Sequence, residues 1–119
     1  MNLTIYHNPA CSKSRQTLAI LNERGISPTI VEYLKTPPDA ETVLDLARKL
    51  GVSVAEIMRS NEADFAAITA EVSADDDAGM AAGIGAHPKA LQRPIVVNED
   101  TGKAVIGRPP ENVLELIDS

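Results

Sequence analysis

A chain of 119 residues, with 44% hydrophobic and 24% charged residues, predicts a single globular domain with a real core. Seventeen acidic and eleven basic residues give a formal net charge of −6, which argues against broad binding to nucleic acid or to an anionic membrane, because both need a basic surface. The single cysteine, Cys11, excludes an internal disulfide and any multi-cysteine metal site. Without a membrane-length apolar run or the basic start and apolar stretch of a signal peptide, the sequence predicts a cytoplasmic protein.

The first third of the chain predicts a strand, a helix and a second strand. Residues 3–6 form a short alternating segment, as in a half-buried strand. Residues 12–24 have helical periodicity, and Gly25 stands where a C-terminal cap belongs. Residues 29–33 indicate another strand. A strand–helix–strand unit favours a parallel pair of strands joined by a right-handed crossover.

The middle of the chain predicts helices. Asp39 can cap the first of them and Gly51 can end it, while Glu56 completes a capping box that opens the second. The fourth carries three glycines, each of which lowers helix stability by up to about 1 kcal/mol relative to alanine. The predicted helices cover residues 39–50, 53–58, 61–71 and 74–86.

The last third returns to strands. Residues 94–97 and 103–106 predict a hairpin, with Gly102 suited to a positive φ in the turn between them. Pro109-Pro110-Glu111 opens a final helix that runs to Ile117. The order β-α-β, helical insert, β-β-α predicts an α/β fold with a thioredoxin-like mixed four-stranded sheet and helices on both faces. We expect one domain, residues 1–119, with the insert at about 39–88.

Cys11 falls between the first predicted strand and the first predicted helix. Backbone N–H groups and the helix dipole at such a position favour an anion, including a thiolate. A free cysteine has a pKa of about 8.5, which nearby cations lower, and His7, Lys13 and Arg15 are within four residues. Ser14, at C-x-x-S spacing, could donate a hydrogen bond to the sulfur. The alternative is a small buried hydrophobic side chain, the usual role of a lone cysteine.

Three familiar motifs are absent around Cys11. A phosphatase-type anion loop needs five residues between its cysteine and arginine, whereas Cys11 and Arg15 are separated by three. The chain has no Walker P-loop. Ser14 stands where a C-x-x-C pair would have its second thiol, so any resolving thiol must come from another molecule.

Five segments, spread in order over essentially the whole chain, carry a resemblance. They are Tyr6–Arg15 followed by Leu18, Tyr33–Pro38, Met58-Arg59, Arg93–Val97 and Gly107–Glu111. Together they resemble the glutaredoxin-coupled arsenate reductase family. The resemblance implies a thioredoxin-like fold with a helical insert.

The same resemblance implies roles for particular side chains. Cys11 is the expected nucleophile, and we place His7, which would assist the thiolate, and Ser14 beside it in the catalytic group. The expected oxyanion-binding residues are arginines, whose planar paired donors match such an anion: Arg59, Arg93, Arg108 and Arg15. The alternative for each arginine is a solvated surface charge, and His7 could equally brace its loop.

The resemblance predicts an arsenate reductase in which the Cys11 thiolate forms a covalent adduct with arsenate. Electrons would come from glutathione as co-substrate and from glutaredoxin as protein partner. We expect no bound cofactor or metal, a monomer, and no nucleic-acid or membrane partner. Two alternatives are a monothiol glutaredoxin-like thioltransferase and a non-enzymatic Spx-type transcription regulator. Ser14 counts against the regulator, because its redox-switching members use a C-x-x-C pair.

Three further expectations concern single positions. Thioredoxin-like folds place a cis-proline opposite the active-site cysteine, so the Arg93–Pro94 peptide is predicted to be cis. His87, which precedes a proline, is expected to be structural. Asp75-Asp76-Asp77 is expected to be a solvated helix start rather than a metal site.

Overall fold

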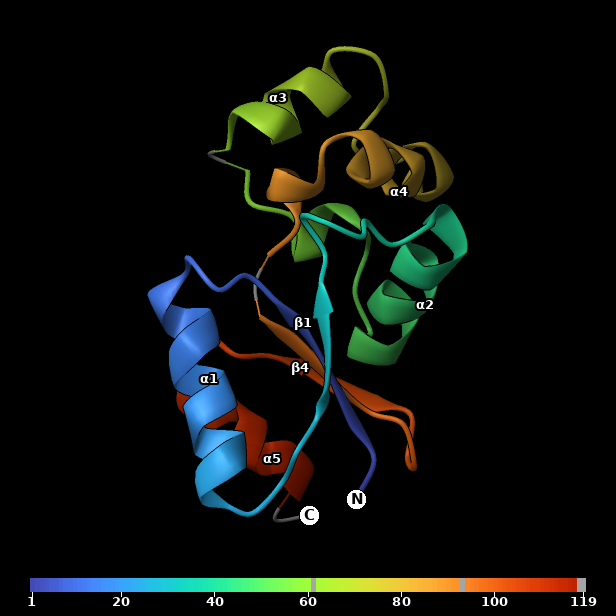
Figure 1. Ribbon diagram of the computed structural model, residues 1–119. Coiled ribbons are helices and arrows are strands. Elements are labelled where there is room, and N and C mark those ends of the chain that lie inside the picture. Colours follow the sequence, from blue (N-terminus) through green and yellow to red (C-terminus); the bar gives the residue numbers. More distant parts are fainter. Residues whose placement is uncertain (61, 93, 118–119) are drawn as a thin grey trace. The chain divides into compact units, whose positions relative to one another are not determined.

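The computed structural model describes residues 1–60, 62–92 and 94–117. The chain divides into two units (Figure 1). The first comprises Met1–Tyr33 and Arg93–Ser119, and the second comprises Leu34–Gln92. Among the described helices, none is long and apolar enough to cross a membrane.

A mixed four-stranded sheet forms the centre of the first unit, with the strand order β2-β1-β3-β4. Its strands are β1 (Leu3–His7), β2 (Thr29–Glu32), β3 (Ile95–Asn98) and β4 (Lys103–Ile106). β1 pairs parallel with β2 and antiparallel with β3, and β3 pairs antiparallel with β4. The predicted parallel pair and the predicted hairpin are both confirmed, and so is the α/β, thioredoxin-like class of the sheet.

Helix α1 (Ser12–Glu23) connects the two parallel strands and packs against the C-terminal segment. That segment consists of the 3₁₀ turn η3 (Pro110–Val113) and the short helix α5 (Leu114–Ile117). The core between sheet and helices is apolar, as burial of such side chains requires: Leu3, Ile5, Leu21, Val96, Val113 and Leu116. This core fixes where α1 begins, and therefore where Cys11 lies.

The C-terminal segment differs from the continuous helix predicted for it. Pro109 and Pro110 have no backbone N–H to donate, and the first bond of the segment runs from Asn112 N to Pro109 O at 3.0 Å, three residues apart. The segment therefore starts as a 3₁₀ turn and becomes α-helical only at Leu114. The Arg108–Pro109 peptide is cis. The cis bond predicted at Arg93–Pro94 lies outside the described residues.

The second unit is helical, as predicted for the insert. Its elements are α2 (Ala40–Leu50), η1 (Ala55–Ile57), α3 (Ala63–Thr69), α4 (Asp77–Ala86) and η2 (Pro88–Ala90). Asp39 caps α2 by accepting from Thr42 N at 2.8 Å, and Gly51 ends it with a φ of +74°. Glu56 accepts from Ser53 N at 2.8 Å, which is one half of the predicted capping box, while the Ser53 hydroxyl also donates to the Glu56 carboxylate.

The glycines of α4 have a packing role. A Cβ at Gly83 would lie 2.7 Å from Ile68 Cγ2 of α3, and one at Gly79 would lie 2.5 Å from Val72 Cγ1. Their weak helix propensity is thus offset by close packing of α4 on its neighbours. The helix begins three residues later than predicted, because Asp76 caps it through Gly79 N.

Candidate active site

Cys11 lies at the end of a tight turn between β1 and α1. The turn is closed by Cys11 N, which donates to Asn8 O at 3.0 Å, and by Asn8 Oδ1, which accepts from Ala10 N at 3.0 Å. Cys11 is the N-cap residue of α1 and its side chain is half-buried. The first turn of this 12-residue helix has no acidic residue. The end of the helix can therefore stabilise a thiolate at Cys11.

Ser14 is the buried polar centre of this turn. Asn8 N donates to Ser14 Oγ at 3.1 Å, and His7 Nδ1 lies 2.6 Å from the same oxygen. Asn8 can only be a donor, so it occupies one of the two lone pairs of the hydroxyl. His7 then shares either the second lone pair or the hydroxyl proton. The structure thus brings His7 and Ser14 together, and Ser14 is three residues after Cys11 in the sequence.

The direction of the Ser14 hydroxyl depends on the tautomer of His7. Burial lowers the pKa of His7, Arg15 lowers it further, and Glu32, its neighbour across β1 and β2, opposes both by raising it. The imidazole is therefore neutral near pH 7. With its proton on Nδ1 it donates to Ser14 and leaves the hydroxyl proton for another acceptor, whereas with its proton on Nε2 it accepts from Ser14. The roles predicted for His7 and Ser14 toward the thiolate stay predictions.

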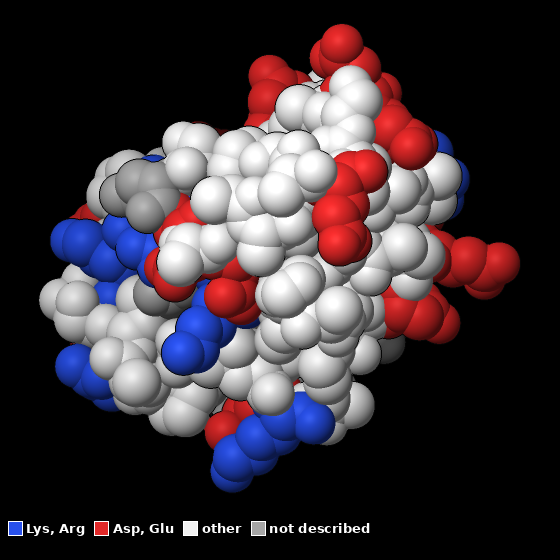
Figure 2. Space-filling model, turned by 90° about the horizontal axis from the view of Figure 1, so that it is seen from above, with Lys and Arg blue, Asp and Glu red and all other residues white. Residues whose placement is uncertain are grey.

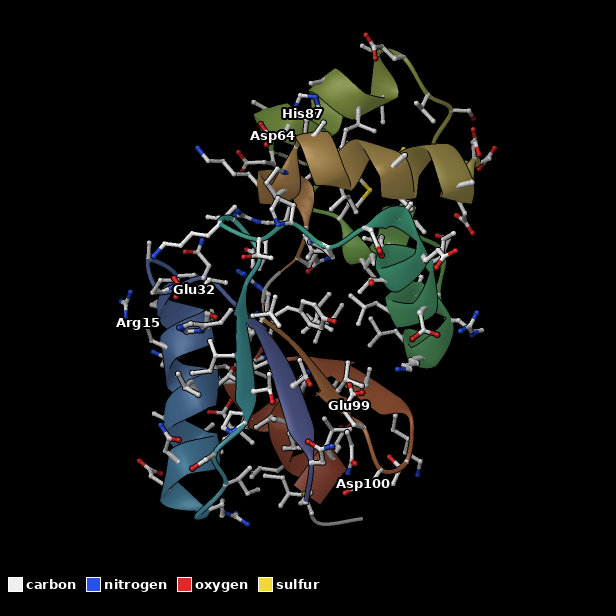
Figure 3. The ribbon with its side chains drawn as sticks, turned by 45° about the vertical axis from the view of Figure 1, so that its right-hand side comes forward. Arg15, Glu32, Asp64, His87, Glu99 and Asp100 are labelled. Carbon is white, nitrogen blue, oxygen red and sulfur yellow. The ribbon has the colours of Figure 1, made fainter. Side chains whose placement is uncertain are left out.

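Arg15 braces the turn that holds the cysteine. Its Nη1 donates to Pro9 O at 2.9 Å, and the side chain is exposed. Figure 3 shows Arg15 and Glu32 at the end of the first unit where α1 begins and β2 ends. The guanidinium has five N–H donors, so the contact with Pro9 leaves its predicted oxyanion role open. On the face in Figure 2, basic side chains stand in small groups among acidic and uncharged ones.

Arg108 follows β4 in a turn that contacts α1. Thr17, buried in α1, has its hydroxyl 2.8 Å from Lys13 O and 3.5 Å from Gly107 O. Thr17 is six residues after Cys11, which corresponds to about 9 Å along a helix, and its hydroxyl points back toward the helix start. The turn that carries Arg108 therefore packs beside the second turn of α1. The exposed side chain of Arg108 suits contact with a dissolved anion.

Arg59 belongs to the second unit and follows η1. Its main chain is fixed there, because Arg59 N donates to Ala90 O at 2.7 Å beside an isolated β-bridge between Met58 and Leu91. Its Nη1 lies 3.2 Å from Glu62 Oε2. The predicted oxyanion ligand is thus engaged by a neighbouring carboxylate.

Arg93, His87 and a possible metal site are the remaining features considered from the sequence. Arg93 lies outside the described residues, so its predicted role stays a prediction. His87 is the C-cap residue of α4, and its carbonyl accepts from Ala90 N at 3.1 Å. The structural role expected for its side chain stays a prediction. Among the described residues, no group of three or more His, Cys, Asp or Glu side chains could hold a metal ion.

Comparison with known protein families shows which family this chain belongs to. A model described as the ArsC family matches residues 6–116. The chain belongs to the ArsC family. A protein of Escherichia coli K12 called "Uncharacterized protein YfgD" is 46% identical over 95% of this chain and 94% of its own length. A Haemophilus influenzae protein named arsenate reductase is 41% identical over 98% of this chain and 100% of its own length.

The fold of this ArsC-family chain also matches a solved structure. An arsenate reductase from Vibrio cholerae has a TM-score of 0.88 and 44% sequence identity, and the match covers 97% of each chain. The family expectation made from the five sequence segments is thereby confirmed, and so is the thioredoxin-like fold.

Sequence reasoning missed four residues of this ArsC-family site. Asn8 organises the turn, Glu32 adjusts His7, Thr17 contacts the turn of Arg108, and Asn112 donates to that turn. Asn8 alone had a local signal, because an asparagine before a proline favours turn initiation. The other three act across elements that are far apart in the sequence.

Proposed function

We propose that this protein reduces arsenate to arsenite, with Cys11 as the nucleophile and with glutathione and glutaredoxin as the source of electrons. The observation that carries the proposal is the placement of Cys11 at the N-terminus of α1, next to the buried His7–Ser14 pair. The names of the ArsC-family relatives from Haemophilus influenzae and Vibrio cholerae support the choice of arsenate as substrate.

The first step joins sulfur to arsenic. The Cys11 thiolate attacks the arsenic atom of arsenate, an S–As bond forms, and one As–O bond breaks as hydroxide leaves and takes up a proton to become water. The positive end of α1 stabilises the thiolate before attack. Ser14 can donate its hydroxyl proton toward the sulfur when His7 holds its own proton on Nδ1.

The second step transfers two electrons. A glutathione thiolate attacks the Cys11 sulfur, a disulfide forms between them, and the electron pair of the S–As bond leaves with arsenic as arsenite. The thiol of glutaredoxin then attacks the glutathione sulfur and releases Cys11 as a thiol. Since Cys11 is the single cysteine, both external thiols are needed. This requirement supports a reducing compartment, which we propose to be the cytoplasm.

Arginines hold the oxyanion in this scheme. A guanidinium presents paired N–H donors that match two oxygens of arsenate, and such charge-assisted bonds are stronger than neutral ones. Arg108 and Arg15 are the described candidates in the first unit, and Arg59 is the candidate in the second. Arg93 completes the proposed set.

One assay separates this function from a thioltransferase. The protein is incubated with glutathione and glutaredoxin, and arsenite release from arsenate is compared with turnover of a glutathione mixed disulfide. We expect arsenite release, and we expect Arg48→Ala on α2 to leave it unchanged, because Arg48 pairs with Asp45 on the surface of that helix. Turnover of the mixed disulfide without arsenite release would overturn the proposal in favour of a thioltransferase.

A further inference from the structure

The turn that carries Arg108 is fixed by its neighbours on three sides. Gly107 N donates to Pro94 O at 2.9 Å, which continues the pairing of β3 with β4 by one residue. Arg108 N donates to Ile106 O at 2.9 Å and closes a three-residue turn. The third side is η3, from which the amide of Asn112 reaches back to the turn.

Close packing leaves this turn no room to move toward α1. A Cβ at Gly107 would lie 2.6 Å from Thr17 Oγ1 and 2.8 Å from Pro94 Cγ. Thr17 has no exposed surface, and its hydroxyl is already bonded to Lys13 O at 2.8 Å. On the side of α1, steric contact therefore fixes the position of the turn. On the side of η3, its position depends on hydrogen bonds.

Asn112 supplies those hydrogen bonds from one atom. Its Nδ2 lies 3.2 Å from Ile106 O and 3.3 Å from Arg108 O, so its two N–H groups can donate to the carbonyl two residues before Arg108 and to the carbonyl of Arg108 itself. Fixing both carbonyls restricts the φ and ψ angles of Arg108, and these angles set the direction in which its side chain leaves the turn. A side chain whose Cα–Cβ direction is already fixed has fewer conformations to lose when its guanidinium binds an anion.

We propose that Asn112 is a positioning residue for Arg108: its amide fixes the turn so that the Arg108 guanidinium is directed at the bound oxyanion. The proposal rests on the proposed function, in which Arg108 binds arsenate. Asn112 itself touches no substrate, so its effect must disappear when Arg108 is removed. A residue that only stabilised the fold would act in the same way with or without Arg108.

The test is a double-mutant cycle on the full chain. Asn112→Leu keeps the size of the side chain and removes both donors, and it is made alone and together with Arg108→Ala. We expect Asn112→Leu alone to lower kcat/KM for arsenate about 10-fold, with most of the change in KM. In the Arg108→Ala background, the same substitution should change kcat/KM less than 2-fold. Asn112→Gln, which keeps two donors, should recover part of the loss.

Asn22→Leu is the matched control, because Asn22 is an exposed asparagine of α1 with no side-chain hydrogen bond among those described. It should leave kcat/KM unchanged. An equal loss from Asn112→Leu with and without Arg108 would overturn the positioning role, even if all variants fold.

A failure of the proposed function would be recognised separately. If the unsubstituted protein released no arsenite, the four proteins of the cycle would be compared by calorimetric titration with arsenate. These are the unsubstituted protein, Asn112→Leu, Arg108→Ala and the double variant. Weaker binding in Asn112→Leu that vanishes in the Arg108→Ala background would support the positioning role without the reductase activity. Absence of arsenate binding, or binding that does not depend on Arg108, would overturn it.

Discussion

Two of the proposed oxyanion ligands, Arg108 in the first unit and Arg59 in the second, differ in the part of the residue that neighbouring groups fix. At Arg108 a side-chain amide fixes the main chain. At Arg59 the main chain is fixed by backbone pairing with Ala90, and the guanidinium contacts the carboxylate of Glu62. The first arrangement fixes the backbone that carries the arginine, whereas the second pairs the guanidinium itself with a carboxylate. The two arginines proposed to bind the oxyanion are therefore fixed through different parts of the residue, the main chain at Arg108 and the side chain at Arg59.

The energies of the two arrangements differ as well. The Arg59–Glu62 pair is a partly exposed i,i+3 pair with 24% and 27% of the two side chains exposed. Such pairs contribute roughly 0–1 kcal/mol, so the pair with Glu62 is only a small obstacle to the arsenate contact proposed for Arg59. The turn of Arg108 is held by steric contact with a buried threonine in addition to hydrogen bonds. Arg108 should therefore be sensitive to changes in packing and Arg59 to changes in charge.

The largest effect is expected from removing Arg108. Charge-assisted hydrogen bonds contribute about 1.5–3 kcal/mol, so Arg108→Ala should lower kcat/KM for arsenate by roughly 10- to 150-fold. Arg108→Lys keeps the charge without the paired donors and should recover only part of the loss. The measurement is steady-state arsenite release, with Arg48→Ala as the control. If Arg48→Ala were as harmful as Arg108→Ala, net charge rather than direction would explain the effect.

The packing of the Arg108 turn is tested by Gly107→Ala. The added Cβ would overlap Thr17 and Pro94, and such overpacking destabilises a protein by about 1–3 kcal/mol. We expect that loss in the free energy of unfolding in urea, together with an approximately 10-fold fall in kcat/KM.

Gly85→Ala in α4 is the matched substitution, because its Cβ would meet only Pro38 O at 3.9 Å. It should raise the free energy of unfolding by up to about 1 kcal/mol through helix propensity. Equal stability changes in the two variants would show that the turn of Arg108 is not tightly packed.

Glu62→Gln tests whether the ion pair with Glu62 competes with an anion for Arg59. Removing the competing charge should strengthen arsenate binding about 2- to 5-fold, the range expected for a partly exposed ion pair. Calorimetric titration at two salt concentrations measures it, and Glu71→Gln removes an exposed charge of the same unit as control. Weaker binding in Glu62→Gln would instead make Glu62 a residue that orients Arg59.

The smallest effect concerns the pH dependence of stability. Because burial lowers the pKa of His7, the unfolded chain binds more protons than the native protein between that lowered pKa and about 6.5. The free energy of unfolding should therefore rise with pH through this interval, and the contribution of neutral His7 should be lost on acidification. In urea unfolding at pH 5 and pH 7.5, the free energy of unfolding should fall more between pH 7.5 and pH 5 for the native sequence than for His7→Gln. The difference in slope should correspond to less than one proton taken up on unfolding. Equal slopes would mean that the pKa of His7 is the same in both states.

Local patterns explain why the order of elements could be predicted. The strand at residues 103–106 and the positive φ of Gly102, +76°, follow from alternation and from a turn that only glycine adopts easily. The late start of α4 was missed because three consecutive aspartates can each cap a helix, and only contacts of the folded chain select Asp76. The close approach of α4 to Ile68, which justifies its glycines, is also a property of the fold.

The site could be predicted less completely than the fold. C-x-x-S spacing singled out Ser14 as a candidate partner of the Cys11 sulfur. It could not show that His7 and Asn8 both bond the Ser14 hydroxyl, because that depends on how residues 7–11 turn. Asn112 had no local signal, since its partners lie at the end of β4. Such contacts join elements that periodicity treats separately.

Arsenite release by the unsubstituted protein and by Cys11→Ser, in the presence of arsenate, glutathione and glutaredoxin, tests the central claim most directly. The serine hydroxyl replaces the single thiol of the chain at nearly the same size. The account predicts steady release by the unsubstituted protein and less than about 1% of that rate from Cys11→Ser, with an unchanged fold. Substantial release by Cys11→Ser would contradict it, because arsenate would then be reduced without the thiolate on which the mechanism depends.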